Sequence, residues 1–374
     1  MKLTKFSIKG LNGKINYDFN FNKDINIITG INGSGKTTIL KIIWYAISGN
    51  IERIAPEINF DSFNLKTNLY SLSLSVDKKE NVINWKYKKD DILVSEDSFE
   101  IRKKYYNNEG SEKLNRLIVE SQTSSLFFPT FRRIEGGYSM ANTRKIRRFS
   151  ADGEVIERFT EYNELQDEFD RLSNTLSVFN HKFVCSISTH DIVSLLTSRY
   201  ARVSEKLNED YLKLSTSIIG KIEGVKSDIK DNKDEAFTIL SELQKEANDI
   251  NKKNKELLKP FNVLSHLAET IFRHKGIRVR SVTLGESVDA IDSGVLSAGE
   301  KQMLSFLCYN AFYDNSVIFI DEPELSLHPD WQRRLFPTLL KQQATNQFVV
   351  ATHSPFIYSK YEDKELVMSQ EKGA

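Results

Sequence analysis

A glycine-rich stretch, "GINGSGKTT", occupies residues 30–38 and fits the pattern G-x-x-x-x-G-K-[ST] with Gly30, Gly35, Lys36 and Thr37. It follows an apolar run and precedes a predicted buried helix, which is the context that this motif requires. Glycines let backbone N–H groups curl around a phosphate, and the helix N-terminus adds partial positive charge. The motif therefore predicts a phosphate-binding loop for a nucleotide.

The chemistry of this loop predicts ATP and Mg²⁺ as its cofactors. Lys36 is expected to reach the β- and γ-phosphates, and the hydroxyl of Thr37 is expected to bind Mg²⁺. The predicted nucleotide contacts in the loop are Gly30, Asn32, Gly33, Ser34, Gly35, Lys36, Thr37 and Thr38.

Two adjacent carboxylates end a second apolar run, "SVIFIDEPELSLHP" at residues 316–329. The carboxyl end of a strand is where an open α/β sheet binds its ligands. Side chains of adjacent residues point to opposite sides, so the two carboxylates can take different roles. Asp321 is expected to hold the Mg²⁺ shell, usually through water, and Glu322 to orient or deprotonate an attacking water. The alternative is a solvated acidic turn before Pro323.

A histidine ends a third apolar run, "QFVVATH", and precedes "SPF". A single histidine after a strand is more often structural. This strand follows the acidic one along the chain, however, so His353 is predicted to lie beside the phosphates and to contact the γ-phosphate or the attacking water.

The stretch "GVLSAGEKQML", residues 294–304, has no obvious nucleophile, metal ligand or general base. It has the form of a turn followed by a helix start, and such a start offers hydrogen-bond donors to an anion. Ser297 and Gly299 are its candidate binding residues.

Strands that alternate with helices around these motifs predict a mainly parallel sheet. Strands are expected within residues 3–29, and more antiparallel strands within 66–98. A buried helix is expected over 35–48 and a polar one over about 110–121. Residues 139–160, which include "RKIRR" at 144–148, are predicted to form an exposed loop or short hairpin.

Residues 189–258 show heptad-like apolar spacing on two segments joined by a polar turn. This spacing predicts a short antiparallel coiled-coil hairpin, whose first helix has roughly 30 residues and a length of about 45 Å. After a four-residue stutter, Tyr211, Leu214 and Ile218 are expected to continue the series of inward-facing residues on the first segment. Pro260 is expected to end the hairpin. Two amphipathic helices packed flat on a globular body remain the alternative.

Composition limits the possible functions. The chain has 374 residues, of which 40% are hydrophobic and 28% charged, and its net charge is +1. No global field therefore attracts nucleic acid or an anionic membrane. No run is long and apolar enough to predict a transmembrane helix. Cys185 and Cys308 lack metal spacing and are predicted to be reduced core thiols, which favours a cytoplasmic protein.

The order of the motifs resembles the ABC-type ATPase head. "LSAGEKQ", "VIFIDEPE" and "ATHSP" follow the phosphate loop, and the resemblance covers residues 1–48 and 284–360. Ala298 and Glu300 depart from the transporter signature LSGGQ. Together with "DEPELSLHPDWQ" they indicate the RecF/SMC/OLD-like branch.

This resemblance implies that two heads sandwich ATP, so that Ser297 and Gly299 of one copy contact the γ-phosphate bound to another. It also implies Thr37 and Asp321 around Mg²⁺, Glu322 as catalytic carboxylate and His353 as switch histidine. The segment 326–328 would cross the dimer interface. The usual Q-loop glutamine cannot be placed, because "FFPTFRRIEGGY" offers Thr130, Arg132 and Arg133 instead.

The same "FFPTFRRIEGG" stretch and the helical insertion resemble ATPase subunits of the bacterial anti-phage systems PARIS and Septu. The expected fold is a P-loop NTPase of ABC type with an N-terminal antiparallel subdomain and a short helical-hairpin insertion. The expected parts are an N-terminal lobe (1–188), the helical insertion (189–275) and a C-terminal lobe (276–374).

Three functions stay open. The chain can be an ATPase that dimerises around ATP and regulates an effector, a nuclease or toxin, in anti-phage defence. It can be a RecF- or SMC-like DNA-binding ATPase for repair, with "RKIRR" on nucleic-acid phosphates rather than in a solvated loop. It can also be a scaffold of higher homo-oligomers in which hydrolysis is incidental. The near-neutral charge and the short helical arm favour the first and third.

Overall fold

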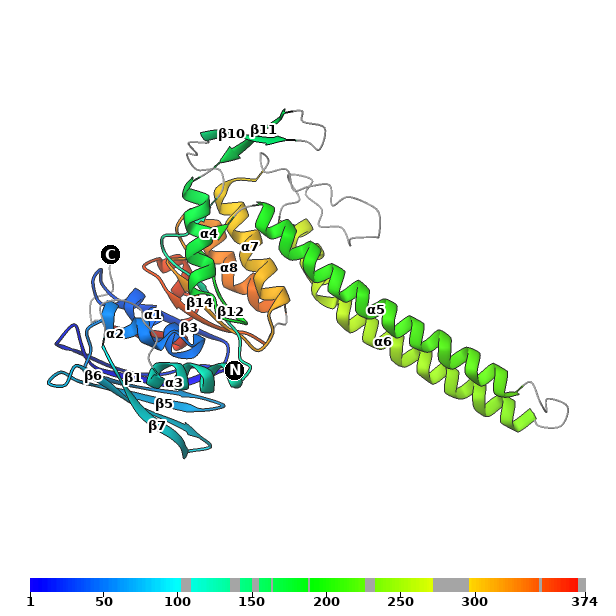
Figure 1. Cartoon of the computed structure of the whole chain (residues 1–374), viewed down its shortest axis with the longest axis horizontal. Helices are drawn as coiled ribbons and strands as arrows, with labels where there is room; N and C mark the ends of the chain where they lie inside the picture. The colour runs from blue at the N-terminus through cyan, green and yellow to red at the C-terminus, as the bar shows by residue number, and fades with distance from the viewer. Residues whose placement is uncertain are drawn as a thin grey trace. The chain divides into compact units, whose positions relative to one another are not determined.

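The structure is a computed structural model, and it describes residues 1–101, 109–134, 142–149, 155–162, 164–187, 189–225, 233–271, 296–342 and 345–368. The chain divides into two compact units, one with both large sheets and one with a long helical hairpin (Figure 1). The predicted α/β class is confirmed, with its antiparallel subdomain, parallel core sheet and helical hairpin.

Six parallel strands form the central sheet in the order β12-β8-β14-β15-β3-β16. Four of them, β3, β8, β14 and β15, are buried at every residue, as expected for parallel strands covered on both faces. Because the strands are parallel, their carboxyl ends meet at one edge of the sheet. Their bounds are β3 Ile25–Thr29, β8 Ser125–Phe128, β12 His181–Phe183, β14 Val317–Asp321, β15 Gln347–Ala351 and β16 Glu365–Val367.

Six antiparallel strands form the second sheet in the order β2-β1-β4-β5-β6-β7. Buried and exposed residues alternate along β4 and β6, which fits a sheet with one covered face. The strand β4 was not predicted from the sequence. The bounds are β1 Leu3–Leu11, β2 Ile15–Asn20, β4 Ser62–Thr67, β5 Ser71–Asp77, β6 Val82–Lys89 and β7 Ile92–Glu100.

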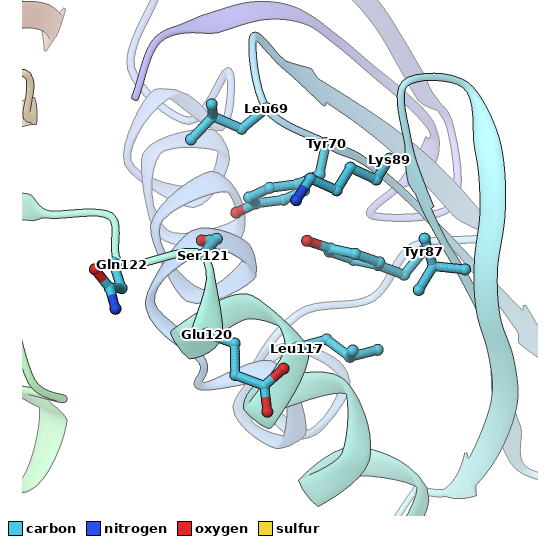
Figure 2. Close-up of a pocket in the computed structure, with 9 residues that line it drawn as sticks. Leu69, Tyr70, Tyr87, Lys89, Leu117, Glu120, Ser121 and Gln122 are labelled. Atoms are coloured by element: carbon cyan, nitrogen blue, oxygen red, sulfur yellow. The ribbon is translucent and has the colours of Figure 1, made fainter.

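A cavity of about 430 Å³ lies between this sheet and the end of helix α3 (Glu109–Glu120). Figure 2 shows Tyr70 and Tyr87 on the sheet side of the cavity and Leu117 and Glu120 on the helix side. The two tyrosine rings stack with their centroids 5.1 Å apart. None of the lining residues belongs to the predicted nucleotide contacts, so this cavity is separate from the phosphate loop.

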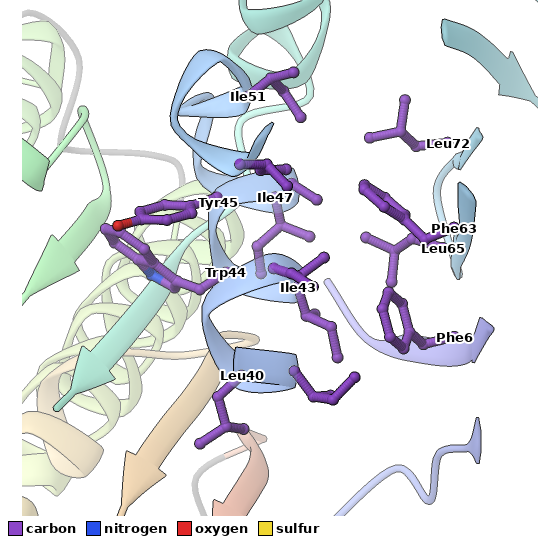
Figure 3. Packing of buried hydrophobic residues seen from close by; sticks show 14 of the residues in the cluster. Phe6, Leu40, Ile43, Trp44, Tyr45, Ile47, Ile51, Phe63, Leu65 and Leu72 are labelled. Atoms are coloured by element: carbon purple, nitrogen blue, oxygen red, sulfur yellow. The ribbon is translucent and has the colours of Figure 1, made fainter. Parts of the chain in front are cut away.

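Helix α1 (Lys36–Ser48) has a buried residue at ten of its thirteen positions. Figure 3 shows Ile43 and Ile47 facing Phe63 and neighbouring residues of the antiparallel sheet, with Trp44 on the other side. The Trp44 ring contacts Phe127 of β8 at a centroid distance of 5.5 Å. Each fully buried side chain of this kind contributes roughly 1.5–3 kcal/mol. This packing fixes the start of α1, and therefore the phosphate loop, against the sheet.

The remaining helices of the first unit connect and cover the strands. They are η1 Ile51–Arg53, α2 Ile54–Glu57, α4 Glu164–Leu176, the start of α7 (Ala298–Phe312), α8 Pro329–Lys341, α9 Pro355–Tyr358 and η3 Glu362–Lys364. Two short strands, β9 (Arg133–Ile134) and β13 (Ser186–Ile187), pair in parallel.

The basic stretch 144–148 lies in a two-stranded antiparallel sheet of β10 (Asn142–Phe149) and β11 (Val155–Tyr162). The predicted hairpin is therefore confirmed. In the backbone register, Arg147 lies opposite Glu157.

The second unit contains the hairpin of α5 (Thr189–Val225) and α6 (Lys233–Ile271), which run side by side (Figure 1). At 37 residues α5 is longer than predicted, and it extends about 55 Å at ~1.5 Å per residue. Pro260 lies inside α6, so the prediction that it ends the hairpin is wrong. Buried Phe261 and Leu264 follow it, and their packing offsets the lost backbone hydrogen bond.

The predicted stutter in α5 is also wrong. Tyr211 is 50% exposed, whereas Asp210 beside it is 7% exposed. Leu214 and Ile218 are partly buried, as predicted, but positions 210, 217 and 221 are also partly or fully buried, so the heptad spacing of 203, 207, 210, 214, 217 and 221 continues without a stutter. This spacing places polar residues in the seam, where each has a partner on α6. Similarly, Leu240 was predicted in the seam of α6 but is 63% exposed.

Two further predictions concern cysteines and membranes. Cys185 and Cys308 are both free and buried, as predicted. Among the described residues, no helix combines the length and apolar character needed to cross a membrane. The strand that the stretch "GIRVRSVTL", residues 276–284, predicts lies outside the described residues.

Candidate nucleotide-binding site

The phosphate loop connects the buried strand β3 to helix α1. Gly30, Gly33 and Gly35 have φ values of 150°, 80° and 94°, in the region that favours glycine over other residues. A Cβ at Gly35 would also lie 3.2 Å from the side chain of Leu11. The loop thus needs glycine at these positions, and the N–H groups at the start of α1 are available for an anion.

Lys36 is a buried cation at the loop. Its ammonium donates to the carbonyl oxygens of Gly30 at 3.0 Å and Ile31 at 3.2 Å, and its Nζ lies 2.6 Å from Nε2 of His353. Burial lowers the pKa of Lys36, and three nearby carboxylates oppose this effect. The lysine charge is thus held where a phosphate group on the loop would need it.

Asp321 ends β14 and is fully buried. Its carboxylate accepts hydrogen bonds from the hydroxyls of Thr37, at 2.8 Å, and Thr130. Burial raises the pKa of Asp321, while these two hydrogen bonds and the charge of Arg132 lower it. The structure therefore brings together the two residues predicted to hold Mg²⁺.

These residues fit a nucleotide-bound Mg²⁺. A buried carboxylate and a threonine hydroxyl are hard oxygen ligands, which Mg²⁺ takes together with substrate phosphates and water. Within the described part of the chain, no group of three or more His, Cys, Asp or Glu side chains could hold a metal. An ion at Thr37 and Asp321 would thus depend on the nucleotide for further ligands.

Arg132 follows β8 and holds the backbone of the acidic strand end. It is 8% exposed, and its guanidinium donates to the carbonyl oxygens of Asp321 at 2.7 Å, Pro129 at 2.9 Å and Glu322 at 2.9 Å. Burial lowers the pKa of Arg132 to about 10, against the opposing effect of nearby carboxylates. In the region where the sequence offers no Q-loop glutamine, Thr130 and Arg132 thus contact Asp321 directly.

Glu322 adopts a left-handed backbone conformation with φ of 48°, and its N–H donates to Ala351 at 2.9 Å. Burial, followed by contact with Glu324, raises the pKa of Glu322 to about 8. Its carboxylate lies 3.5 Å from Nε2 of His353. Burial, followed by the charge of Lys36, lowers the pKa of His353. The predicted base and the predicted switch histidine are therefore neighbours.

Glu324 is a residue of this site that sequence reasoning missed. Its carboxylate accepts from the hydroxyl of Thr352 at 2.7 Å and from the N–H of His353 at 2.8 Å. It thus ties the end of β15 to the segment after β14. The second glutamate of "DEPE" was the available signal, but its partners lie 28 and 29 residues further along the chain.

Ser297 and Glu300 form a capping box at the start of α7. The N–H and hydroxyl of Ser297 donate to Oε2 of Glu300 at 2.8 and 2.7 Å, and the Glu300 N–H lies 3.4 Å from the serine hydroxyl. Ser297 remains exposed. The glutamate that distinguishes this motif from LSGGQ therefore has a structural role in its own chain.

Gly299 allows a close approach between two segments. A Cβ at this position would lie 2.3 Å from the carbonyl oxygen of Ser326, closer than real contacts allow. Nearby, the amide of Gln302 donates to Pro323 at 2.9 Å. Among the described contacts, those of Ser297 and Gly299 are thus with Glu300 and Ser326, not with the phosphate loop of the same chain.

Gln332 in α8 bridges the two segments that follow β14 and β15. Its Nε2 donates to the carbonyl oxygen of Leu327 at 2.8 Å, and its Oε1 accepts from the hydroxyl of Ser354 at 2.5 Å. His328 is exposed and caps α8 by accepting from the N–H of Asp330 at 3.4 Å. One side chain therefore links the segment predicted at the dimer interface to the segment of the switch histidine.

A phosphate loop, an acidic strand end and a histidine on neighbouring parallel strands define a P-loop ATPase of ABC type. The model of the family described as "AAA domain, putative AbiEii toxin, Type IV TA system" matches residues 25–359. The chain belongs to this family of ATPase domains.

Three curated proteins are similar in sequence. "Retron Vc95 probable ATPase" of Vibrio cholerae serotype O1 biovar El Tor is 22% identical over 391 residues, which cover 93% of this chain and 69% of that protein. "Retron Ec83 probable ATPase" of Escherichia coli is 36% identical over 73 residues, 16% of this chain and 14% of that one. "Endonuclease GajA" of Bacillus cereus (strain VD045) is 35% identical over 75 residues, 18% and 13% of the two chains.

Among solved structures, the Smc head domain with an extended coiled coil, bound to the C-terminal domain of ScpA, from Pyrococcus furiosus is similar at a TM-score of 0.40. It is 14% identical and covers 96% of this chain and 91% of its own. The assignment of the fold rests on the sheet order and the family match.

Proposed function

We propose that this ATPase binds ATP with Mg²⁺, closes as a homodimer around the nucleotide and regulates a protein effector, a nuclease or toxin, in anti-phage defence. The observation that carries the ATPase part is the cluster at the sheet edge. A buried carboxylate contacts the loop threonine there, and a second carboxylate with a raised pKa lies beside a histidine. The names of the retron and GajA relatives support the defence part.

Each residue has a separate task in this proposal. The N–H groups of the loop and Lys36 bind the β- and γ-phosphates, and Thr37 and Asp321 hold Mg²⁺, which would neutralise charge on the phosphates. Glu322 accepts a proton from the attacking water, and its pKa near neutrality suits a general base. His353 contacts the γ-phosphate or that water.

The dimer part of the proposal assigns Ser297 and Gly299 to the γ-phosphate held by a second copy. It is supported by the exposure of Ser297 at the N-terminus of α7, where N–H groups and the helix dipole favour an anion. We also propose the three-part division into an N-terminal lobe, a helical insertion and a C-terminal lobe at 188/189 and 275/276.

The decisive experiment is purification of Glu322→Gln with ATP and Mg²⁺, followed by mass measurement and identification of bound molecules. We expect ATP to stay bound because the base is lost and the binding groups are kept. A dimer of the variant with a protein partner is the expected result. A monomer with bound ATP would exclude the sandwich dimer.

Ser297 can be tested apart from its capping role. Ser297→Arg should abolish turnover while ATP binding to the phosphate loop is kept. Ser297→Asn keeps a capping side chain that can still donate to Glu300 but adds bulk at the predicted γ-phosphate contact, so it should also lose turnover while α7 stays folded. Wild-type turnover in both variants would contradict the assignment of Ser297.

A DNA-binding ATPase for repair is the second candidate, and the basic stretch 144–148 in β10 favours it. That function requires salt-dependent DNA binding that ATP strengthens. Recovery of nucleic acid without a protein partner in the Glu322→Gln experiment would select this candidate over effector regulation.

A further inference from the structure

The outer half of helix α5 presents apolar side chains to solvent. Tyr211, Leu212, Ile219 and Ile222 are 50%, 68%, 53% and 51% exposed. In ordinary amphipathic helices such residues face the interior. Contiguous exposed apolar groups on this scale mark interaction surfaces.

These residues share one side of the helix. At 100° per residue, positions 211, 212, 215, 219 and 222 fall within one stripe, which is the spacing of a helix face that packs on a neighbour. The residue at 215 is an exposed serine, so the stripe contains no charged side chain. We call these five positions the α5 stripe.

Several charged side chains of this half of the hairpin are paired across the seam between the two helices. Asp210 pairs with Lys253 at 2.6 Å, and Lys221 pairs with Glu242 and Glu246 at 2.9 Å. The hydroxyl of Ser217 donates to Glu246 at 2.9 Å. The polar seam satisfies these groups but leaves the apolar side chains of the same segment without a place in the hairpin.

Helix α6 adds two apolar residues near the same end of the hairpin. Phe237 and Leu240 are 71% and 63% exposed. The Lys221–Glu242 pair places this part of α6 at the level of Ile222. By typical side-chain areas, the exposed parts of the four apolar side chains of the α5 stripe amount to on the order of 400 Å² on each copy, which is the scale of a small, weak interface.

We propose that the α5 stripe docks against the α5 stripe of a second copy of this chain. The stripe is neutral, so two identical stripes meet without repulsion between like charges. A partner recognised by charge would find no complementary group on it. Identical patches also close a two-fold interface without further contacts, which is the commonest arrangement in homodimers. This contact requires no nucleotide, and it is therefore additional to the proposed closure of the heads around ATP.

The first test measures self-association by sedimentation in the absence of nucleotide. The wild type should form dimers at micromolar concentration, and Leu212→Glu combined with Ile219→Glu should weaken the dimer at least tenfold, because it buries charges against apolar groups. The matched control is Thr216→Glu, at an exposed position of α5 outside the stripe. Far-ultraviolet circular dichroism should show equal helix content in all three proteins.

The second test uses a cross-link across the two-fold contact. Ile219→Cys should form a dimer with a short bis-maleimide, since both native cysteines are buried and do not compete. Lys206→Cys, also on α5 but outside the stripe, should not be cross-linked under the same conditions.

Three outcomes would overturn the proposal. They are a wild type that stays monomeric without nucleotide, a Leu212→Glu/Ile219→Glu variant that associates like the wild type, and an Ile219→Cys variant that does not cross-link to itself. Loss of a co-purifying protein by the stripe variant, with no change in self-association, would assign the stripe to that partner instead. Head closure is tested separately by combining Glu322→Gln with the two stripe substitutions in one chain and measuring whether ATP still causes dimerisation.

Discussion

The edge of the central sheet and the outer half of the hairpin both bury charged side chains, but with opposite results. At the sheet edge, burial raises the pKa values of Asp321 and Glu322; neighbouring donors oppose this effect at Asp321, whereas neighbouring carboxylates raise the pKa of Glu322 further. In the hairpin, Asp210 and Lys221 are paired with charges of the same unit. The carboxylates of the sheet edge therefore lack a full charge partner, which a bound cation could supply, whereas the hairpin has apolar surface available for a partner.

The largest effect is expected at the phosphate loop, where Lys36 supplies the positive charge that is predicted to bind the phosphates. Lys36→Ala removes the ammonium that faces the predicted phosphates and should lower ATP turnover by a factor on the order of 100 or more. Phosphate release and nucleotide binding measure it, with Lys23→Ala, an exposed lysine before β3, as control. Equal turnover in both variants would show that the loop does not bind the reacting phosphates.

The next effect concerns the group that holds the sheet edge in place. Arg132→Ala leaves buried carbonyl oxygens of Asp321 and Glu322 without donors, which should lower the free energy of unfolding by ~1–3 kcal/mol and reduce kcat. The stability and kcat of Arg132→Lys should lie between those of the wild type and Arg132→Ala, since an ammonium lacks the planar arrangement of donors of a guanidinium. Denaturant unfolding and ATPase kinetics measure both. Arg116→Ala, an exposed arginine of α3, should change neither, and a similar loss in it would refute the role of Arg132.

The pH dependence of stability tests the raised carboxyl pKa at the sheet edge. The folded-state pKa of Glu322 is raised from 4.5 to about 8, so the folded protein binds more protons than the unfolded chain between these values. Stability without nucleotide should therefore fall as pH rises from about 4.5 to 8. Glu322→Gln should flatten this slope in thermal unfolding measured from pH 5 to 9. An unchanged slope in the variant would assign the titration to other groups.

The smallest effect is expected in the hairpin, where the charges are already paired. Asp210→Leu combined with Lys253→Leu replaces a seam ion pair by apolar contact, which is often neutral or stabilising. Amide hydrogen exchange in α5 should stay the same or become slower. Faster exchange along the whole of α5 would show instead that this ion pair is needed for the two helices to associate.

Local motifs made much of the fold predictable from the sequence. The loop at 30–38 and the acidic strand end at 321–322 are contiguous, so their residue types and spacing indicate both structure and chemistry. The short strands β12 and β16 were missed because three residues carry little periodicity and because their partner strands, β8 and β3, lie far away along the chain. The sequence singled out Arg132 but could not give its role, because two of its acceptors are backbone carbonyls about 190 residues away.

The prediction of which residues face inward in the hairpin was wrong in part for a different reason. The sequence prediction placed apolar residues inside, as hydrophobic burial usually requires, and therefore introduced a stutter at Tyr211. The structure keeps the heptad spacing and pairs Asp210 with Lys253 in the seam. Which residues face inward here depends on partners on the other helix, and a single helix cannot reveal them.

The two hydrogen bonds made by Gln332 require one orientation of its side-chain amide. Its amide nitrogen meets a carbonyl oxygen of Leu327 and its amide oxygen meets the hydroxyl of Ser354, and a half-turn of the amide would set oxygen against the Leu327 carbonyl. The Gln332 side chain therefore joins the two loops in only one orientation of its amide group. A displacement of the 326–328 segment cannot be absorbed by turning this side chain over, so it must either be passed on to the loop of His353 or break the bridge.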